Sequence, residues 1–318
     1  MILNLFYIIL GLFLLVQGGD WLVEGASDIA RRARLSSMVI GLTVVGFGTS
    51  MPELLVSTQA ALVGNSGIAI GNVVGSNIAN IALILGMAAL IHPCPTDSKT
   101  LHIDTPFMIL SCLLLMAIGL TGTIGRVPGL IGVGMLVCFI VWQIRNSRKN
   151  SQPSAPVEAS AAGSKSWTDT LWFEICIVVV SLGCLSFGAD TLIEGASGIA
   201  RDLGVSDRII GLTIVAVGTS LPELFASVTA ARKGETDMAI GNVIGSVTFN
   251  ILSVIGVASI ISPIHEANVG FVFDYLLMAF LGILLWLFLR TQHLLERYEG
   301  AILLCIYVAY IARTIYLS

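Results

Sequence analysis

The amino-acid sequence contains two copies of one segment, and this repeat constrains the fold more than any other feature. Residues 20–86 align with residues 190–256 without a gap, at a constant offset of 170, and roughly half of the aligned positions are identical. GLTVVGFGTSMPELLVSTQAA returns as GLTIVAVGTSLPELFASVTAA, and IGNVVGSNIANI returns as IGNVIGSVTFNI. A chain with such a repeat is expected to fold as two related halves.

Both copies lie within long apolar runs. Of the 318 residues, 56% are hydrophobic and only 11% are charged, whereas an ordinary soluble domain carries about 25% charged residues. A membrane span needs about 20 apolar residues. Breaking the chain at polar and Pro/Gly clusters gives ten such segments: 2–28, 37–62, 68–91, 104–121, 128–145, 169–198, 208–231, 238–261, 272–290 and 298–316. We therefore expect an all-α polytopic membrane protein with ten transmembrane helices.

One stretch, residues 146–168, is too polar to span a membrane. Its sequence, NSRKNSQPSAPVEASAAGSKSW, has the small, polar and Pro-containing composition of a flexible linker. It divides the chain into a first five-helix repeat, 1–145, and a second, 169–318. Because five is an odd number, the second copy enters the membrane from the opposite face. Such inverted repeats, with discontinuous helices at their interface, are typical of secondary transporters.

The positions of Lys and Arg predict the orientation. With ten spans, 12 of the 16 Lys and Arg residues fall on the side of the linker. Positive charge favours the cytoplasmic side, so we expect a multi-pass protein of the cell inner (plasma) membrane, with a cytoplasmic linker and both termini outside. The formal net charge of -4 excludes the basic surface that nucleic-acid binding needs, and no motif indicates an obligate protein partner.

Each copy interrupts an apolar helix with the motif Gly-Thr-Ser-x-Pro-Glu. The prolines, Pro52 and Pro222, each remove a helix N–H and clash with the carbonyl one turn earlier. The carbonyl oxygens freed in this way need another partner inside a membrane. The glutamates that follow, Glu53 and Glu223, lie near mid-span, where a carboxylate is costly unless it faces a cavity, a proton or a cation.

The next helix of each copy adds a hydroxyl and an amide four residues apart. These pairs, Ser76 with Asn80 and Ser246 with Asn250, lie on one helix face. Carbonyls, hydroxyls, amides and carboxylates are oxygen ligands, which select hard cations such as Ca²⁺. Two glutamates meeting across a pseudo-two-fold axis would neutralise one divalent ion. The sequence therefore predicts one cation pocket between four helices, and no cofactor besides the transported ions.

Structural roles are favoured for other polar and small residues. We expect Asn72 and Asn242 to brace the backbone of the broken helices, and glycines 71, 75, 241 and 245 to let helices approach closely. The acidic residues near the ends of the first helix of each half are expected to be solvated or paired with Arg31 and Arg201; they are Asp20, Glu24, Asp190 and Glu194. Segments 2–28 and 169–198 are glycine-rich and lack a mid-span carboxylate, which makes them the predicted moving elements.

The paired GTSxPE and GNVxGSxxxN segments closely resemble the alpha repeats of the cation/calcium exchanger superfamily, especially its prokaryotic sodium/calcium exchanger branch. The resemblance covers essentially the whole chain and implies electrogenic exchange of three Na⁺ for each Ca²⁺ by alternating access. It implies a Ca²⁺ site formed by Glu53 and Glu223 with backbone oxygens of Thr49 and Thr219. It also implies Na⁺ sites from Thr49, Ser50, Ser76 and Glu53, and from Thr219, Ser220, Ser246 and Glu223, with the carbonyls of Gly46 and Ala216 as further ligands.

The second copy departs from the family pattern at one point. Several relatives carry an aspartate where this chain has Asn250, and Val247 and Thr248 replace the usual Asn-hydrophobic pair. Only two carboxylates then remain in the predicted pocket. The potassium-dependent branch associates that aspartate with K⁺, so its absence predicts exchange without K⁺.

Three rival functions differ in what they require of the sequence. An H⁺/Ca²⁺ exchanger is the main alternative, because glutamates in apolar surroundings can carry protons. An intramembrane hydrolase would need paired catalytic aspartates, a Ser/His pair or an HExxH motif, and the sequence has none of these. A receptor or structural protein would have no reason to bury a duplicated carboxylate.

Overall fold

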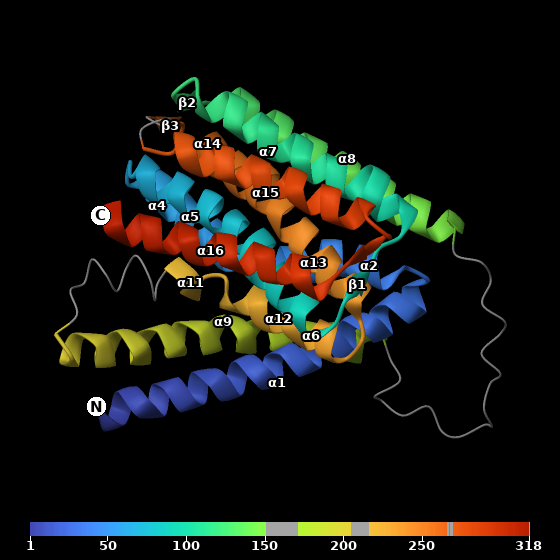
Figure 1. Cartoon of the computed structure of the whole chain (residues 1–318), viewed down its shortest axis with the longest axis horizontal. Helices are drawn as coiled ribbons and strands as arrows, with labels where there is room; N and C mark the ends of the chain where they lie inside the picture. Colours follow the sequence, from blue (N-terminus) through green and yellow to red (C-terminus); the bar gives the residue numbers. More distant parts are fainter. Residues whose placement is uncertain (151–170, 205–215, 266, 268–269, 318) are drawn as a thin grey trace.

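The protein is a bundle of long helices with two very short β ladders (Figure 1). The computed structural model describes residues 1–150, 171–204, 216–265, 267 and 270–317. Within these residues, eight helices are long and apolar enough to cross a membrane, and a bent pair adds a ninth. The one remaining predicted span, 208–231, begins outside the described residues. The all-α membrane fold is therefore confirmed, while the count of ten stays a prediction.

The elements of the first half follow the predicted order. They are α1 (Ile2–Ala33), α2 (Ser37–Ile40), η1 (Gly41–Val45), α3 (Gly46–Thr49), α4 (Met51–Leu62), α5 (Ser66–Ile78), η2 (Ala79–Ile84), α6 (Leu85–Ile91), β1 (Cys94–Pro95), η3 (Thr100–Asp104), α7 (Thr105–Gly119), β2 (Thr123–Ile124) and α8 (Arg126–Asn150). Here η denotes a π-helical segment. Helix α8 continues to Asn150, so the first residues of the predicted linker are helical.

The described elements of the second half follow the same order, without a counterpart of η3. They are α9 (Leu171–Asp202), α11 (Ala216–Gly218), α12 (Leu221–Arg232), α13 (Thr236–Phe249), η6 (Asn250–Ile255), α14 (Gly256–Ile261), β3 (Ile264–His265), α15 (Val272–Arg290), β4 (Leu294–Leu295) and α16 (Arg297–Leu317). The remaining predicted linker residues, 151–168, lie outside the described part of the chain.

The two β ladders join the two halves at opposite ends of the bundle. Strand β1 pairs with β4, and β2 pairs with β3, both antiparallel. The repeat offset of 170 relates Cys94 in β1 to Ile264 in β3, and Ile124 in β2 to Leu294 in β4. Each ladder is therefore the counterpart of the other, and they lie at opposite ends of the long axis (Figure 1). This arrangement agrees with two repeats of opposite orientation.

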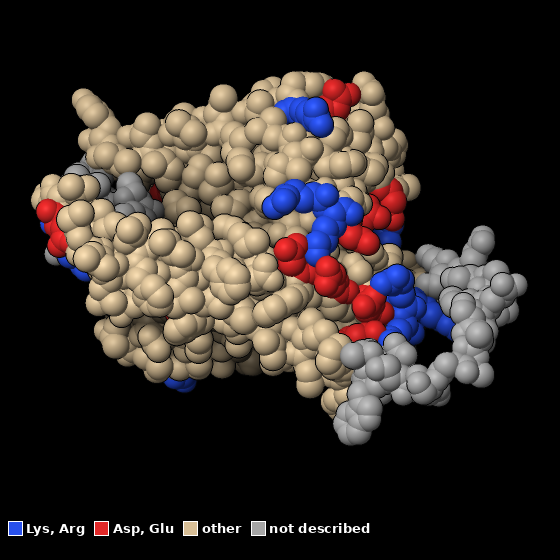
Figure 2. Space-filling model, turned by 90° about the horizontal axis from the view of Figure 1, so that it is seen from below, with Lys and Arg blue, Asp and Glu red and all other residues tan. Residues whose placement is uncertain are grey.

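Charged side chains follow the same division into two ends. Figure 2 shows Lys, Arg, Asp and Glu gathered towards the ends of the long axis, with a broad uncharged region between them. Large apolar side chains such as Phe6, Leu130 and Val179 are exposed, as expected where lipid replaces water. Both termini lie at one end of the molecule, and α8 ends at the other (Figure 1). Which end faces the cytoplasm stays a prediction.

The most buried helices are the third of each half. The spans Ser66–Ile91 and Thr236–Ile261 are 72% and 78% buried, whereas the remaining long helices are 22–39% buried. Both central spans contain π-helical turns, η2 and η6. A π turn inserts one extra residue per turn and frequently marks a functional site. The two repeats thus place their central helices where a pocket enclosed by protein can form.

Helices α1 and α9 form an antiparallel pair at one side of the body (Figure 1). Their contact is close because a Cβ on Gly11 would lie 2.7 Å from the Gly188 carbonyl oxygen. Both ends of the pair are tied by polar contacts, since Arg32 pairs with Glu174 and the N-terminal amine lies 3.4 Å from Asp202. The two predicted moving segments therefore form one unit.

The acidic residues of α1 have a different partner from the one predicted. Lys233, just beyond α12, pairs with Asp20 at 3.1 Å and with Glu24 at 2.9 Å, while Arg31 pairs with Asp28. Burial lowers the pKa of Lys233, but its hydrogen bonds and charge interactions with Glu24 and Asp20 outweigh burial and raise that pKa. Glu24 is exposed and Asp20 is partly exposed, as the solvated alternative predicts, whereas the described ion pairs do not join either residue to Arg31, because the fold brings a distant lysine closer.

Candidate functional site

The motif Gly-Thr-Ser-x-Pro-Glu bends the second helix of the first half. Helices Ser37–Thr49 and Met51–Leu62 meet at 45° around Ser50, and Pro52 occupies the first turn after the bend. Glu53 lies in that first turn, where the positive end of the helix dipole favours a carboxylate. In the second half, a break at Thr219 and Ser220 separates α11 from α12, and Glu223 lies in the first turn of α12. The predicted discontinuous helices are present.

Hydrogen bonds across the two halves bring the predicted residues together. The Ser50 hydroxyl donates to Glu223 Oε1 at 3.1 Å. In the first half, the Ser76 hydroxyl lies 3.5 Å from Glu53 Oε1. The Ser246 hydroxyl reaches back across the interface to the Gly46 carbonyl oxygen at 3.4 Å. Residues far apart in the sequence therefore converge on one buried polar centre between the repeats.

Both glutamates are fully buried and retain an oxygen without a partner. Glu53 and Glu223 are each 0% exposed, and neither Oε2 has a hydrogen-bond partner among the described residues. The described ion pairs include neither carboxylate. Buried polar atoms are normally satisfied, and a lone buried carboxylate is costly. The centre therefore presents unsatisfied oxygen acceptors to a cation or a proton.

Further unpaired atoms come from the same predicted set. Four more buried side-chain atoms have no hydrogen-bond partner among the described residues. They are the hydroxyl oxygen of Ser220, the side-chain oxygen Oδ1 of Asn250, and both side-chain amide atoms of Asn80. Thr49 is buried and its hydroxyl lies 3.3 Å from Asn242 Oδ1. Thr219 is only partly buried, and no contact of its hydroxyl is described. Ala216 begins α11, and its side chain lies outside the described part.

The two bracing asparagines have the predicted role. Asn72 Nδ2 donates to the Glu53 carbonyl oxygen at 3.3 Å and to the Ser57 hydroxyl at 2.9 Å. Asn242 repeats both bonds, to the Glu223 carbonyl oxygen at 3.3 Å and to the Ser227 hydroxyl at 2.8 Å. Each amide thus holds the backbone next to a site carboxylate. The serines of this brace were not predicted from the sequence, although both copies contain Ser four residues after Glu.

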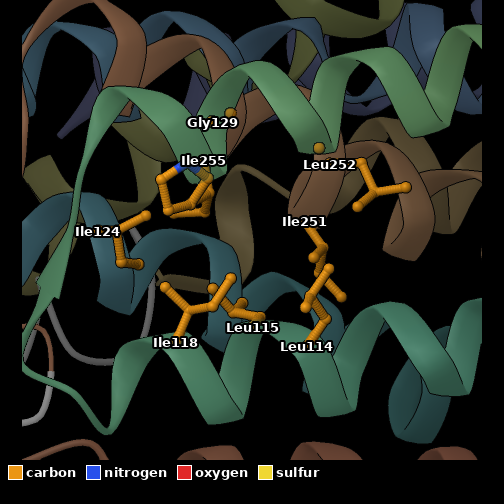
Figure 3. Close-up of a pocket in the computed structure, with 11 residues that line it drawn as sticks. Leu114, Leu115, Ile118, Ile124, Gly129, Ile251, Leu252 and Ile255 are labelled. Atoms are coloured by element: carbon orange, nitrogen blue, oxygen red, sulfur yellow. The ribbon is translucent and has the colours of Figure 1, made fainter.

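The described part of the chain has no group of three or more His, Cys, Asp or Glu side chains arranged for a metal. A site here must therefore combine its two carboxylates with neutral oxygens. A separate apolar cavity of about 30 Å³ lies between α7, α8 and η6, and its lining includes Leu115, Ile124 of β2 and Ile255 (Figure 3). It contains no polar side chain, so it offers no ligand to a cation.

Close backbone contact brings α13 against α2 and η1, the part of the broken helix that precedes the bend. A Cβ on Gly245 would lie 2.3 Å from the Leu42 carbonyl oxygen, and one on Gly241 would lie 2.5 Å from that of Met38. The predicted close approach is therefore correct for these two glycines. It does not hold for Gly71 and Gly75 within the described residues, where Gly71 has only ordinary contacts and Gly75 has no heavy atom within 4 Å.

This difference between repeat-related glycines predicts a difference in stability. We expect Gly245→Ala to destabilise the protein by about 1–3 kcal/mol, because the methyl group must displace backbone. Gly75→Ala adds a methyl group without a described clash and gains up to about 1 kcal/mol of helix propensity. Thermal unfolding in detergent measures both variants. Equal midpoints would contradict the close approach seen at Gly245.

Fold and site together define an integral membrane transporter that moves cations, rather than an enzyme. A family model described as sodium/calcium exchanger protein matches residues 3–145 and 173–316. The chain therefore belongs to the sodium/calcium exchanger family, and its membership supports exchange of cations that include Ca²⁺.

Relatives and a solved structure agree over the full length. CaxA of Alkalimonas amylolytica, a proposed antiporter, is 39% identical, and the match covers 98% of each chain. Sodium/calcium exchanger MaX1 of Methanosarcina acetivorans is 33% identical over 99% of each chain. The sodium-calcium exchanger NCX_Mj, solved after soaking in Na⁺ and Sr²⁺, is 34% identical, with a TM-score of 0.84 and 98% of each chain covered. The similarity in fold thus extends beyond the repeated motifs.

Proposed function

We propose that this protein exchanges Ca²⁺ for Na⁺ across the cell membrane by alternating access. The observation that carries the proposal is the pair of fully buried glutamates, Glu53 and Glu223, each with one oxygen that lacks a hydrogen-bond partner among the described residues. A carboxylate at this depth in a membrane protein marks an ion or proton pathway. Two of them balance one divalent cation, and Ca²⁺ accepts the irregular set of oxygens that surrounds them.

The proposed ligands come from both halves. Ca²⁺ would be held by Glu53 and Glu223 with the backbone oxygens of Thr49 and Thr219. Na⁺ would be held at adjoining positions by the hydroxyls and carbonyls of Ser50, Ser76, Ser220, Ser246, Gly46 and Ala216, with Asn80 and Asn250 beside them. The hydrogen bonds from Ser50 and Ser76 to the carboxylates support this assignment, because cations would replace these bonds with oxygen coordination.

The charge of the site favours electrogenic exchange. Two glutamates neutralise one Ca²⁺, whereas three Na⁺ leave one net positive charge on the loaded site. Moving one charge through 100 mV changes the free energy by about 2.3 kcal/mol. The accumulation of Ca²⁺ should therefore change about 50-fold with that potential. K⁺ has no assigned place because residue 250 is an asparagine, so exchange is proposed to be independent of K⁺.

The proposed setting is the cell inner (plasma) membrane, with both termini outside and the linker cytoplasmic. The concentration of Lys and Arg on the side of the linker supports this orientation. The proposed partners are Ca²⁺, Na⁺ and the lipid bilayer.

Flux into vesicles tests the function directly. Purified protein in liposomes loaded with Na⁺ is diluted into Na⁺-free medium with ⁴⁵Ca²⁺, and uptake is compared with vesicles loaded with K⁺, with choline or at a different pH. We expect rapid uptake only with outward Na⁺, and faster uptake at an inside-positive potential, since net positive charge leaves. Uptake driven by a pH gradient and indifferent to Na⁺ would instead indicate the H⁺/Ca²⁺ exchanger.

A further inference from the structure

The two asparagines of the central helices are related by the repeat but form different hydrogen bonds. Asn250 Nδ2 donates to Asn77 Oδ1 at 3.1 Å, and its own Oδ1 is buried without a partner among the described residues. Asn80, its counterpart at the offset of 170, has no described partner for either amide atom. An amide has only one oxygen, so its orientation decides whether it offers an acceptor or a donor.

The difference arises from a residue outside the predicted site. Asn77 is fully buried in α5, one residue after Ser76, and the repeat replaces it with Val247 in the second half. Valine cannot form a hydrogen bond with a neighbouring amide. Asn80, the counterpart of Asn250 in the first half, therefore has no equivalent of Asn77 to orient its amide.

A sulfur atom sets the orientation of Asn77. Its Nδ2 lies 3.5 Å from the sulfur of Met278 in α15, and a thioether can only accept. The amide nitrogen of Asn77 therefore faces Met278, which leaves its oxygen to face Asn250. Asn250 therefore donates from Nδ2 to Asn77 Oδ1, and its side-chain oxygen, Oδ1, is left without a partner among the described residues. The two hydrogen bonds that join Met278, Asn77 and Asn250 are therefore possible with only one orientation of each amide.

The free side-chain oxygen of Asn250 is buried, and the residue lies on the same helix face as a member of the polar centre. Asn250 follows Ser246 by four residues, on the same side of the helix, and Ser246 reaches the Gly46 carbonyl oxygen of the opposite half. We propose that Asn77 is a positioning residue. Together with Met278, it orients the side-chain amide of Asn250 so that the amide oxygen, Oδ1, coordinates the transported cation. This inference rests on the proposed function and assigns a role to two residues that touch no cation themselves.

The test is a double-mutant cycle read as cation affinity. Asn77→Val, which copies the second half, should raise the Ca²⁺ concentration for half-maximal ⁴⁵Ca²⁺ uptake about 10-fold, with the maximal rate within 2-fold. Asn250→Ala should raise this half-maximal Ca²⁺ concentration at least as much. The double variant should be no worse than Asn250→Ala alone, because Asn77 acts through Asn250. Met278→Leu keeps the volume but removes the acceptor, and should raise it about 3-fold.

Val247→Ala serves as the matched control, since it perturbs the equivalent buried position without touching the chain of amides. It should leave the half-maximal concentration within 2-fold. Additive effects of Asn77→Val and Asn250→Ala, or an effect of Asn77→Val on the maximal rate alone, would overturn the positioning role. So would an unchanged concentration in Asn250→Ala. The proposed function itself would fail differently, through absent Na⁺-driven uptake in the unaltered protein.

Discussion

Replacing Glu53 or Glu223 by alanine is expected to reduce Na⁺-driven Ca²⁺ uptake by more than 100-fold. Both side chains are fully buried, and a water molecule that filled the vacated space would carry no negative charge. Removing one glutamate from a buried group of two carboxylates and a divalent cation is expected to cost about 3–5 kcal/mol of binding free energy. Each 1.4 kcal/mol corresponds to a factor of ten in affinity. The site would keep one negative charge for a divalent cation. The measurement is the initial rate of ⁴⁵Ca²⁺ uptake at fixed amounts of folded protein.

The isosteric variants separate charge from packing. Glu53→Gln and Glu223→Gln preserve the shape and one carbonyl oxygen, and should lose nearly as much transport as the alanine variants. Glu194→Gln is the matched control, because Glu194 is an exposed carboxylate of α9 outside the polar centre. It should transport normally. Unaltered uptake in both Glu53→Gln and Glu223→Gln would exclude these carboxylates as the cation ligands.

The sequence predicts most of the architecture because the repeat and the membrane act together. Apolar length identifies the spans, and the bend at Ser50 follows from Pro52 with the preceding glycine. The π-helical segments such as η2 and η6 were not predicted, since one extra residue per turn does not alter an already uniform apolar pattern. The β ladders were missed for a related reason. Two-residue strands such as Cys94–Pro95 are too short to show alternation.

The sequence identifies residues of the buried polar centre where the two copies agree, and overlooks one neighbour of that centre where they differ. Glu53, Glu223 and Ser50 stand out because each recurs in a motif that membrane helices do not otherwise tolerate. Asn77 was overlooked because the second copy has Val247 at the corresponding position, so the repeat does not single it out as a polar residue of the site. Its acceptor, Met278, lies 201 residues away, and only the folded chain reveals that contact.

Cross-linking α1 to the body is expected to stop transport, because the paired helices α1 and α9 are proposed to slide during alternating access. A disulfide needs two Cβ atoms about 3.5–4.5 Å apart, and a Cβ on Gly19 would lie 2.9 Å from Thr229 Oγ1 in α12, an atom bonded directly to the Thr229 Cβ. The double variant Gly19→Cys/Thr229→Cys should therefore cross-link on mild oxidation. Uptake should fall at least 20-fold and return on reduction.

A second cross-link distinguishes sliding from a general loss of flexibility. A Cβ on Gly198 would lie 2.7 Å from Asn4 Cγ, so Asn4→Cys/Gly198→Cys should tie α1 to α9 without touching the body. If the pair moves as one unit, this disulfide leaves uptake within about 2-fold. The ion pairs of Lys233 with Asp20 and Glu24 do not prevent such movement, because partly exposed pairs contribute only about 0–1 kcal/mol. Full uptake with a verified Gly19–Thr229 cross-link would contradict the sliding model, and loss of uptake with both disulfides would show that α1 and α9 must also move against each other.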